Sequence, residues 1–333
     1  MNGSDVKEFV EIKEIIINSS SAIVITNNLT INCRMILDCS GYNSKFIKQG
    51  SNIKYEYFWN VYGKDFIYSE NSNIREDTTF LGALVAEYKS DKILINDVPQ
   101  NNSTYTPWMY VLSDKKIPLD EMKKYYEIAL KSEFLKNKIV NCEIGKEKYG
   151  WIPAKDIISH ANDRILSLGD SSALSPWTSG STFSYMLKHL EEYCQKLQIC
   201  IHTNSLTSKD LDKIVEKNIN EKVDFDLGKL VFMLIKNCNS QEYDKLNEIT
   251  RKINVDNLIN FIFFLDAKPS EIMSIGNYIV SEFGLLNILR IFARHNSKDE
   301  YKMAVEVVED LYYYKKDIGK YKTQKLSFTN DLS

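Results

Sequence analysis

The chain lacks most of the residue patterns from which a catalytic or metal site is commonly inferred. Its six cysteines include no C-x-x-C pair, and its four histidines have no cysteine or carboxylate at metal-ligand spacing. It has no G-x-S-x-G sequence either, which argues against a serine hydrolase. We therefore expect no metal centre, buried and reduced thiols, and histidines that act as surface or capping residues. These residues are Cys33, Cys39, Cys142, Cys194, Cys200, Cys238, His160, His189, His202 and His295.

The chain also lacks a strong excess of charge and any long apolar run. Lysine and arginine number 42 against 45 aspartates and glutamates, and the basic residues are scattered along the sequence. A role in binding nucleic acid is therefore not expected. The N-terminus carries no basic and apolar leader, and the longest apolar run, near 258–265, is far shorter than the roughly 20 residues that cross a bilayer. We expect a cytoplasmic protein without a transmembrane segment.

A third absence concerns glycine. None of the 13 glycines belongs to a G-x-G-x-x-G sequence, the loop whose backbone amides hold the diphosphate of a dinucleotide. A complete dinucleotide-binding fingerprint is therefore missing, although 333 residues with 44% hydrophobic content are sufficient for two or three folded domains.

The N-terminal half has the periodicity of β-structure. Residues 8–41 alternate between β-rich runs and polar turns, which predicts a small meander. The last run, Met35–Cys39, does not alternate and predicts a strand that is buried on both faces. Aromatic-rich segments over 50–115 predict a curved antiparallel sheet, and 118–136 then switches to helical spacing.

The C-terminal part, from about 205 to 316, is helical by pattern. Its amphipathic segments follow residues that commonly cap or begin a helix. No sequence repeat recurs at a fixed period, so a solenoid is not expected. The expected starting positions are Ser208, Asp226, Pro269 with Ser270, and Ser297.

The most informative motif is RILSLGDSSALSPWTSGSTFSYML, residues 164–187. An apolar strand ends in Gly169-Asp170, and a short loop leads to a helix that opens on Ser179-Gly180-Ser181. A carboxylate at the end of a buried strand can accept hydrogen bonds from a ribose-like chain, while the amides of the helix start face anionic oxygens. This arrangement is typical of a nucleotide or flavin site. The apolar side chains expected to pack the helix on the sheet are Phe183, Met186, Leu187, Leu190, Cys194 and Leu197.

A second motif, DCSGYNS, follows the strand Met35–Cys39. Gly41 permits a tight turn with close approach to a ligand, and Asn43 and Ser44 offer polar groups. The alternative interpretation is an ordinary turn after a strand, and the heptad alone does not decide between the two.

Taken together, the two motifs resemble the second and third conserved motifs of the FAD-dependent enzymes related to aromatic hydroxylases, geranylgeranyl reductases and lycopene cyclases. They occur in the family's order, with a β-rich insert between them. VYGKDF, TYTPWMYVLS and EKYGWIPAK resemble in particular the lycopene cyclase and geranylgeranyl reductase branch. The resemblance covers roughly residues 8–200.

The resemblance implies a site for FAD. Asp170, next to Gly169, would bind the ribityl chain of the flavin. Gly180 and Ser181, with Ser179 beside them, would lie near the flavin ring or its phosphate. The wall shared by cofactor and substrate domains would be formed by Gly41, Asn43 and Ser44.

The same resemblance implies an α/β fold with α+β features, in several domains. A partial Rossmann-like FAD-binding domain is expected from 1–48 and 150–203, with an antiparallel β-sheet substrate domain, 49–149, inserted between its two segments. A helical C-terminal domain, 204–317, and a flexible tail, 318–333, complete the prediction. The aromatic residues expected either to line a hydrophobic substrate cavity or to fill the core are Trp59, Tyr62, Trp108, Tyr110 and Trp151.

The family's N-terminal strand, glycine-rich loop and helix would precede Met1 and are not in this sequence. One hypothesis is a truncated FAD-dependent oxidoreductase, or a lycopene-cyclase-like flavoenzyme, that acts on a hydrophobic and perhaps isoprenoid substrate. The alternative is a non-catalytic remnant or binding module that has lost its diphosphate-binding loop. A partner chain that supplies the missing segment, on an exposed edge or apolar patch, is compatible with both. A helical partner-binding protein is the third hypothesis.

Overall fold

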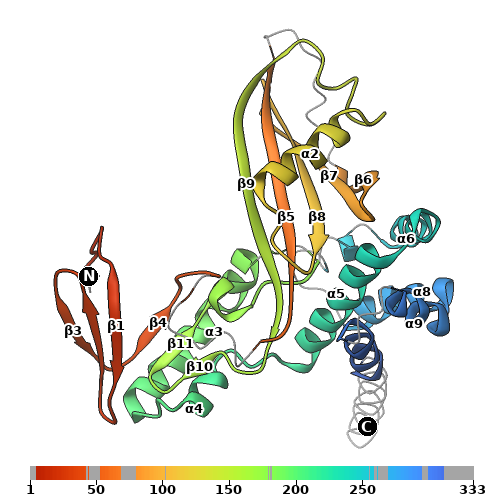
Figure 1. The fold of residues 1–333 in the computed structure, drawn as a ribbon. Helices are drawn as coiled ribbons and strands as arrows, with labels where there is room; N and C mark the ends of the chain where they lie inside the picture. Colours follow the sequence, from red (N-terminus) through yellow and green to blue (C-terminus); the bar gives the residue numbers. More distant parts are fainter. Residues whose placement is uncertain are drawn as a thin grey trace, which may run out of the picture.

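The computed structural model describes residues 5–42, 44, 53–68, 80–101, 103–178, 180, 182–254, 256–258, 261, 269–294 and 299–310. Three separate sheets and a group of helices make up these residues, so the expected mixture of helices and antiparallel strands is confirmed. In space, the small sheet near the N-terminus stands apart at one side, and the helices gather near the lower end of the tall sheet that contains β5 (Ile53–Tyr68), β8 (Thr104–Ser113) and β9 (Cys142–Ile157) (Figure 1).

The N-terminal sheet is an antiparallel meander of β1 (Ile12–Ile17), β2 (Ala22–Thr26) and β3 (Thr30–Cys33), as the alternation predicts. The buried guanidinium of Arg164 joins this meander to the next sheet. Its Nε donates to the carbonyl of Asn18 at 3.1 Å, and its Nη1 donates to the carbonyl of Arg34 at 2.9 Å. The meander is therefore anchored by backbone carbonyls from two of its segments.

The second sheet contains the only parallel pair among the described strands. β4 (Ile36–Asp38) runs parallel to β11 (Ile165–Ser167), which also pairs with the short β10 (Ala161–Asn162). The prediction that β4 is buried on both faces is wrong, because Leu37 is 47% exposed. Within the described part of the chain, β4 is an edge strand, and no described layer covers Leu37.

The third sheet has five antiparallel strands in the order β6–β7–β8–β5–β9, and it confirms the antiparallel sheet predicted from the aromatic segments. Helix α2 (Leu119–Leu130) packs on it, and its Met122 and Tyr126 are buried against Tyr62 and Met109. The helix is shorter than the predicted 118–136, because turns begin at its C-cap Lys131. The strands are β5 (Ile53–Tyr68), β6 (Phe80–Tyr88), β7 (Asp91–Asn101), β8 (Thr104–Ser113) and β9 (Cys142–Ile157).

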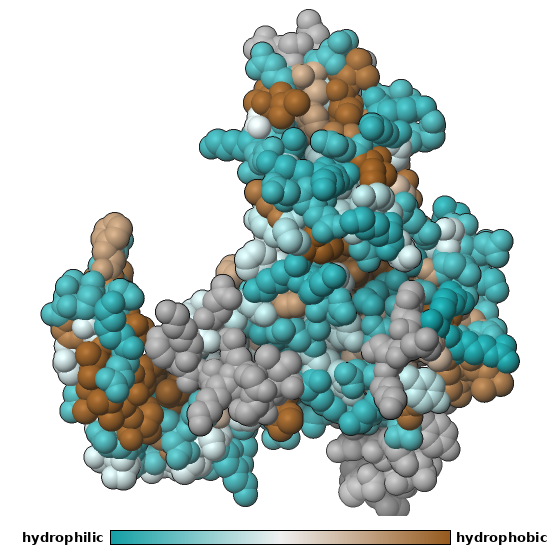
Figure 2. Space-filling view, in the orientation of Figure 1, coloured by the Kyte–Doolittle hydropathy of each residue, from teal (hydrophilic) through white to brown (hydrophobic). Residues whose placement is uncertain are grey.

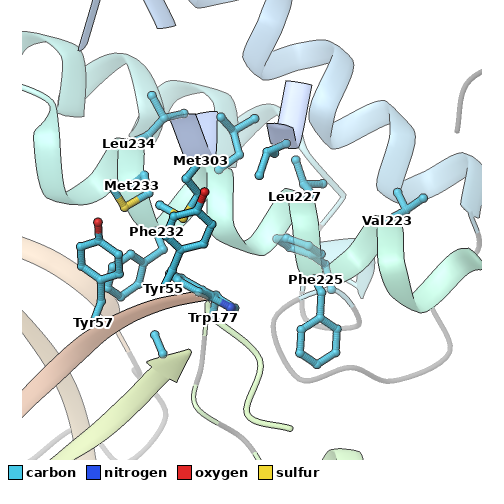
Figure 3. Close-up of a cluster of buried hydrophobic side chains, with 14 of the residues drawn as sticks. Tyr55, Tyr57, Trp177, Val223, Phe225, Leu227, Phe232, Met233, Leu234 and Met303 are labelled. Carbon is cyan, nitrogen blue, oxygen red and sulfur yellow. The ribbon is translucent and has the colours of Figure 1, made fainter. Parts of the chain in front are cut away.

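The helical region follows β11. Residues 299–310 are also helical, and the expected tail, 318–333, lies outside the described residues. Side chains from the lower end of the five-stranded sheet and from the helices share one core, in which Tyr57, Trp177 and Phe232 meet edge to face or tilted (Figure 3). The helices with assigned bounds are α3 (Thr182–Thr203), α4 (Ser208–Asp212), α5 (Ile219–Asn237), α6 (Ser240–Lys252), α8 (Pro269–Phe283) and α9 (Leu285–Ala293).

Of the four predicted helix starts, Ser208 and Pro269 agree with the structure, Asp226 is wrong, and Ser297 lies outside the described residues. α4 begins at Ser208 and is capped by Thr207, whose side chain accepts from the amide of Asp210. α5 begins earlier than Asp226, because Asn218 and Glu221 exchange side-chain-to-backbone hydrogen bonds of 2.8 and 3.1 Å at its start. α8 begins at Pro269 as predicted, while Ser297 is not described.

The predicted apolar face of α3 is also wrong in part. The side chains that pack into the core are Tyr185, His189, Tyr193 and Leu197. Phe183, in contrast, is 75% exposed, and it heads an uncovered stripe that continues along the helix. The members of this stripe, called the α3 stripe below, are Phe183, Leu187, Leu190 and Cys194.

The expectations for histidine and cysteine need correction as well. His189 is buried beside Glu221, with Nε2 and Oε1 2.7 Å apart, and is no surface residue. All six cysteines are free, as expected, but Cys39 and Cys194 are exposed and only Cys238 is buried. None of the described helices has the length and apolar character to cross a membrane. The described residues also hold no group of three metal-ligating side chains.

Candidate functional site

The Gly169-Asp170 motif forms a tight single turn between β11 and α3. Residues Gly169–Ser172 make a short 3-10 helix, η1, which begins one residue after the end of the buried strand β11. Gly169 has a φ of +71° and Ala173 a φ of 51°, so the chain reverses through two left-handed residues. This reversal places Asp170 near the start of α3.

The carboxylate of Asp170 ties the turn to the first residue of α3. Its Oδ1 accepts from the hydroxyl of Ser175 at 2.7 Å and from the hydroxyl of Thr182. Asp170 is partly exposed, and Oδ2 has no donor among the described residues. The geometry therefore leaves one carboxylate oxygen suited to accept from a ligand hydroxyl, at the end of a 22-residue helix whose amides carry positive potential.

Asp38, at the end of β4, joins the two motifs. Its buried carboxylate accepts from the backbone amide of Ser40 at 3.0 Å, from the hydroxyl of Ser44, and from the hydroxyl of Ser167 at 3.3 Å. Its backbone carbonyl accepts from the hydroxyl of Ser171 at 2.6 Å. A buried carboxylate that is satisfied from both segments fixes the turn after β4 against the turn after β11.

Gly180 is the point where the five-stranded sheet meets the start of α3. It has a φ of +63°, and a Cβ built on it would lie 2.4 Å from Cγ2 of Ile152 on β9. Only glycine fits this position, since both the backbone conformation and the space exclude a side chain. Nearby, the indole N–H of Trp59 donates to the carbonyl of Trp177 at 2.9 Å, which ties β5 to the same loop.

The structure brings together those predicted site residues that it describes. Gly41 makes a turn with a φ of +80°, and Ser44 reaches Asp38. Asn43, Ser179 and Ser181 lie outside the described residues. Whether these positions bind a cofactor stays a prediction.

A charged and aromatic cluster, which the sequence analysis missed, lies beside Gly41. The hydroxyl of Tyr42 donates to Oε1 of Glu56 at 3.0 Å, and the Nζ of Lys155 lies 3.3 Å from the same oxygen and 3.7 Å from the centre of the Tyr42 ring. Lys116 places its Nζ 4.0 Å from the Tyr42 ring and 4.3 Å from the Trp151 ring. Burial lowers the pKa of both lysines below the usual range. The one available signal was a lysine, Lys155, at an inward position of an aromatic-rich strand.

Of the other aromatic residues named from the sequence, some are buried in a core and some are only partly buried. Tyr62 is fully buried beneath α2 and belongs to the core. Trp59 and Tyr110 pack partly buried against the shared core, with ring centres 5.9 Å apart. Lys148 lies 5.4 Å from the ring of Trp108. Of the five, Trp151 is the one that faces the lysine cluster.

A cavity of about 310 Å³ lies between the end of β9, α4 and α5. His160, which lines it, is partly buried, and its Nδ1 is 2.9 Å from the carbonyl of Ser172, so this nitrogen carries the proton. Burial lowers the pKa of His160 to about 4, and the imidazole is therefore neutral at physiological pH. His160 thus fits the capping alternative of the prediction, because its ring binds the carbonyl at the end of the Gly169–Ser172 turn.

Comparison with known proteins bears on the fold. No protein-family model matches the sequence, and no curated protein does so. Among solved structures, a geranylgeranyl bacteriochlorophyll reductase-like protein from Thermoplasma acidophilum has a TM-score of 0.56 at 16% identity, over 81% of this chain. The halogenase PltM, solved in complex with FAD, has a TM-score of 0.53 at 10% identity, over 92% of this chain. The anhydrotetracycline hydroxylase OxyS from Streptomyces rimosus has a TM-score of 0.52 at 12% identity, over 80% of this chain.

The chain therefore shares its fold with these three proteins, one of which was solved with FAD bound. The resemblance that the two motifs predict is thereby confirmed at the level of fold. The chain spans 69% of the length of the reductase-like protein and of PltM, and 54% of OxyS. The remaining 31% of the first two neighbours and 46% of OxyS have no counterpart here.

Proposed function

We propose that the chain is the flavin-ring and ribityl-binding part of an FAD-dependent oxidoreductase that acts on a hydrophobic substrate, with isoprenoids as the first class to test. The observation that carries the proposal is the junction at Asp38. It fastens two motifs that are 130 residues apart into one turn assembly, next to the carboxylate of Asp170. A flavoenzyme fold with this junction supports FAD rather than another ligand.

The residues present fit the flavin half of the cofactor. Asp170 would accept from the ribityl hydroxyls, and Gly180 lets Ile152 of β9 pack directly against the start of α3, which fixes the helix start beside Asp170. The amides at the start of α3 would stabilise negative charge on the reduced ring. When bound, FAD would supply hydride transfer, and the five-stranded sheet would orient the substrate and exclude water.

A remnant or binding module is the second candidate, and the missing glycine-rich loop favours it. Without that loop the chain forgoes several charge-assisted hydrogen bonds to the diphosphate, at roughly 1.5 to 3 kcal/mol each. Such a loss can reduce FAD affinity below the level at which the cofactor stays bound through purification.

A partner chain that supplies the missing strand, loop and helix would reconcile the two candidates. Two uncovered surfaces support this proposal. β4 has an open edge in a parallel sheet, a kind of sheet that is normally covered on both faces. The α3 stripe is an exposed apolar face of α3, next to the face of the same helix that is buried in the core. Apolar side chains also gather on the N-terminal meander, where Ile12, Ile16 and Ile31 are exposed (Figure 2).

The test is an FAD titration of the purified chain, followed by visible absorption and flavin fluorescence after removal of free ligand. We expect the wild-type chain to retain flavin and Asp170→Ala to bind at least tenfold more weakly. Asp170→Asn should keep the bonds to Ser175 and Thr182, and it separates loss of the turn from loss of the carboxylate. Asp244→Ala, an exposed site on α6, is the control for charge removal.

Two other outcomes would each contradict part of the proposal. A wild-type chain without flavin bands would overturn the enzyme proposal for this chain alone and favour the remnant. Equal flavin content in the wild-type chain and Asp170→Ala would remove the role assigned to Asp170.

A further inference from the structure

Lys116 is held in an unusual setting for a lysine. Its Nζ lies over three rings, 4.0 Å from the centre of Tyr42, 4.3 Å from Trp151 and 5.6 Å from Phe58. It forms no ion pair with any described carboxylate, although most lysines in the described sheet do. Aromatic faces stabilise an ammonium group only in part, and a desolvated cation still favours an anion.

Glu56 acts favourably on the charge of Lys116, but it forms no direct ion pair with it. Glu56 is the carboxylate of the cluster, and it is already engaged by the hydroxyl of Tyr42 at 3.0 Å and by Lys155 at 3.3 Å. The side chain of Lys155 is only 3% exposed, so its charge is poorly screened by water. Two ammonium groups therefore share one carboxylate. Burial lowers the pKa of Lys155, Glu56 acts in the opposite direction, and the charge of Lys116 lowers this pKa further.

The position of the cluster links it to the candidate site. Tyr42 follows the Gly41 turn and packs on Phe58 of β5, with ring centres 5.6 Å apart, so the cluster lies on the face of the sheet next to this turn. The carboxylate of Asp170 also acts on the charge of Lys155. The two ammonium groups therefore lie where the five-stranded sheet meets the Gly41 turn, and Lys116 is half-buried rather than sealed.

We propose that Lys116, backed by Lys155, binds the anionic head group of an amphiphilic substrate, a carboxylate or a phosphate, whose apolar part lies against the aromatic residues of the sheet. That the ligand is a substrate rests on the proposed function, but the binding site itself does not. An anion would give the ammonium group of Lys116 a direct partner in a partly desolvated place, where one charge-assisted contact is strong. A neutral head group would leave the two ammonium groups opposed, and a cationic one would be repelled.

The experiment compares four ligands that share one apolar tail: decyl phosphate, decanoate, decanol and decylamine. Each is titrated below its critical micelle concentration against the full chain, with intrinsic tryptophan fluorescence as the readout. The variants are Lys116→Gln, the charge-keeping Lys116→Arg, and Lys115→Gln, an exposed neighbour that controls for loss of one positive charge. We expect the wild-type chain, Lys115→Gln and Lys116→Arg to bind at least one anion about tenfold more tightly than decanol, and Lys116→Gln to lose this preference.

The two anions distinguish the head groups, since a preference for decyl phosphate over decanoate, or the reverse, identifies which one the site takes. Equal affinity for anion and alcohol in the wild-type chain, or no binding of either, overturns the proposal. An equal loss in Lys115→Gln and Lys116→Gln also overturns it, because it would reflect the general field of the surface. Flavin binding is measured separately on Asp170 variants, so anion preference without flavin would refute the proposed enzyme and leave this site standing.

Discussion

The five-stranded sheet and the three-stranded sheet that contains β4 differ in how completely their faces are covered. In the five-stranded sheet, α2 packs on strands whose inward residues Tyr62, Met109 and Ile95 are essentially inaccessible. In the smaller sheet, β4 leaves Leu37 and one edge open, and the helix that follows β11 carries the uncovered α3 stripe. Among the described residues, the five-stranded sheet has a covered face, and the sheet with β4 has an open edge and an exposed apolar side chain.

The difference shows which part of the molecule is self-sufficient. In the five-stranded sheet, β6, β7 and β8 pair consecutively, and β5 pairs with β8 and β9 from further along the chain, so every pairing is antiparallel. The parallel pair β4–β11 is closed only by a connection that runs through the whole five-stranded sheet. Parallel strands are normally covered by helices on both faces, whereas an antiparallel sheet can leave one face in water.

The largest loss of stability is expected from truncating a side chain that is buried between α2 and the five-stranded sheet. Met122 on α2 is fully buried, and Met122→Ala removes side-chain volume from the centre of that core. We expect a loss of about 2 to 5 kcal/mol in the free energy of unfolding, which is typical of such truncations. Urea denaturation followed by circular dichroism measures it. A loss below about 1 kcal/mol would mean that α2 is not packed as described.

A smaller loss in the free energy of unfolding is expected where β9 meets the start of α3. Gly180→Ala adds a Cβ at 2.4 Å from Ile152 in a left-handed conformation, whereas Gly169→Ala meets only Thr182 at 3.7 Å and suffers the backbone strain alone. We expect Gly169→Ala to cost about 1 kcal/mol and Gly180→Ala about 2 to 3 kcal/mol, in the same unfolding measurement. Equal costs would show that Ile152 moves aside, and that the contact between sheet and helix start is loose.

The sequence predicted the complete parts better than the incomplete ones. The alternation over 8–41 and the aromatic segments were sufficient for the meander and the antiparallel sheet, because each residue's face is set by neighbours in the same sheet. The burial of β4 and of α3 was predicted wrongly, because an apolar pattern states which side chains require covering but not whether a layer is present to cover them.

Within the candidate site, local patterns identified the turns but not the contacts between them. Gly41, Gly169 and Gly180 all have the positive φ that a glycine in a tight turn suggests. The bond from Ser167 to Asp38 and the placement of Lys116 over Tyr42 and Trp151 join residues far apart in sequence. Such pairs follow from the fold, which no local spacing encodes.

The smallest effect on stability is expected on the α3 stripe, and it sharpens the comparison most. Leu187→Gln keeps helix propensity and changes a side chain that is 54% exposed, so the free energy of unfolding should change by less than about 0.5 kcal/mol. Tyr185→Gln, on the buried face of the same helix, is the matched control and should cost several times more.

Sedimentation velocity of the wild-type chain and of both variants then reports whether a second copy of the chain covers the α3 stripe. A wild-type chain that self-associates, and becomes monomeric in Leu187→Gln, would assign the stripe to a second copy of this chain. A wild-type chain that is already monomeric leaves the stripe open for the partner chain, because an apolar arc continuous with a buried helix face is otherwise costly to keep in water.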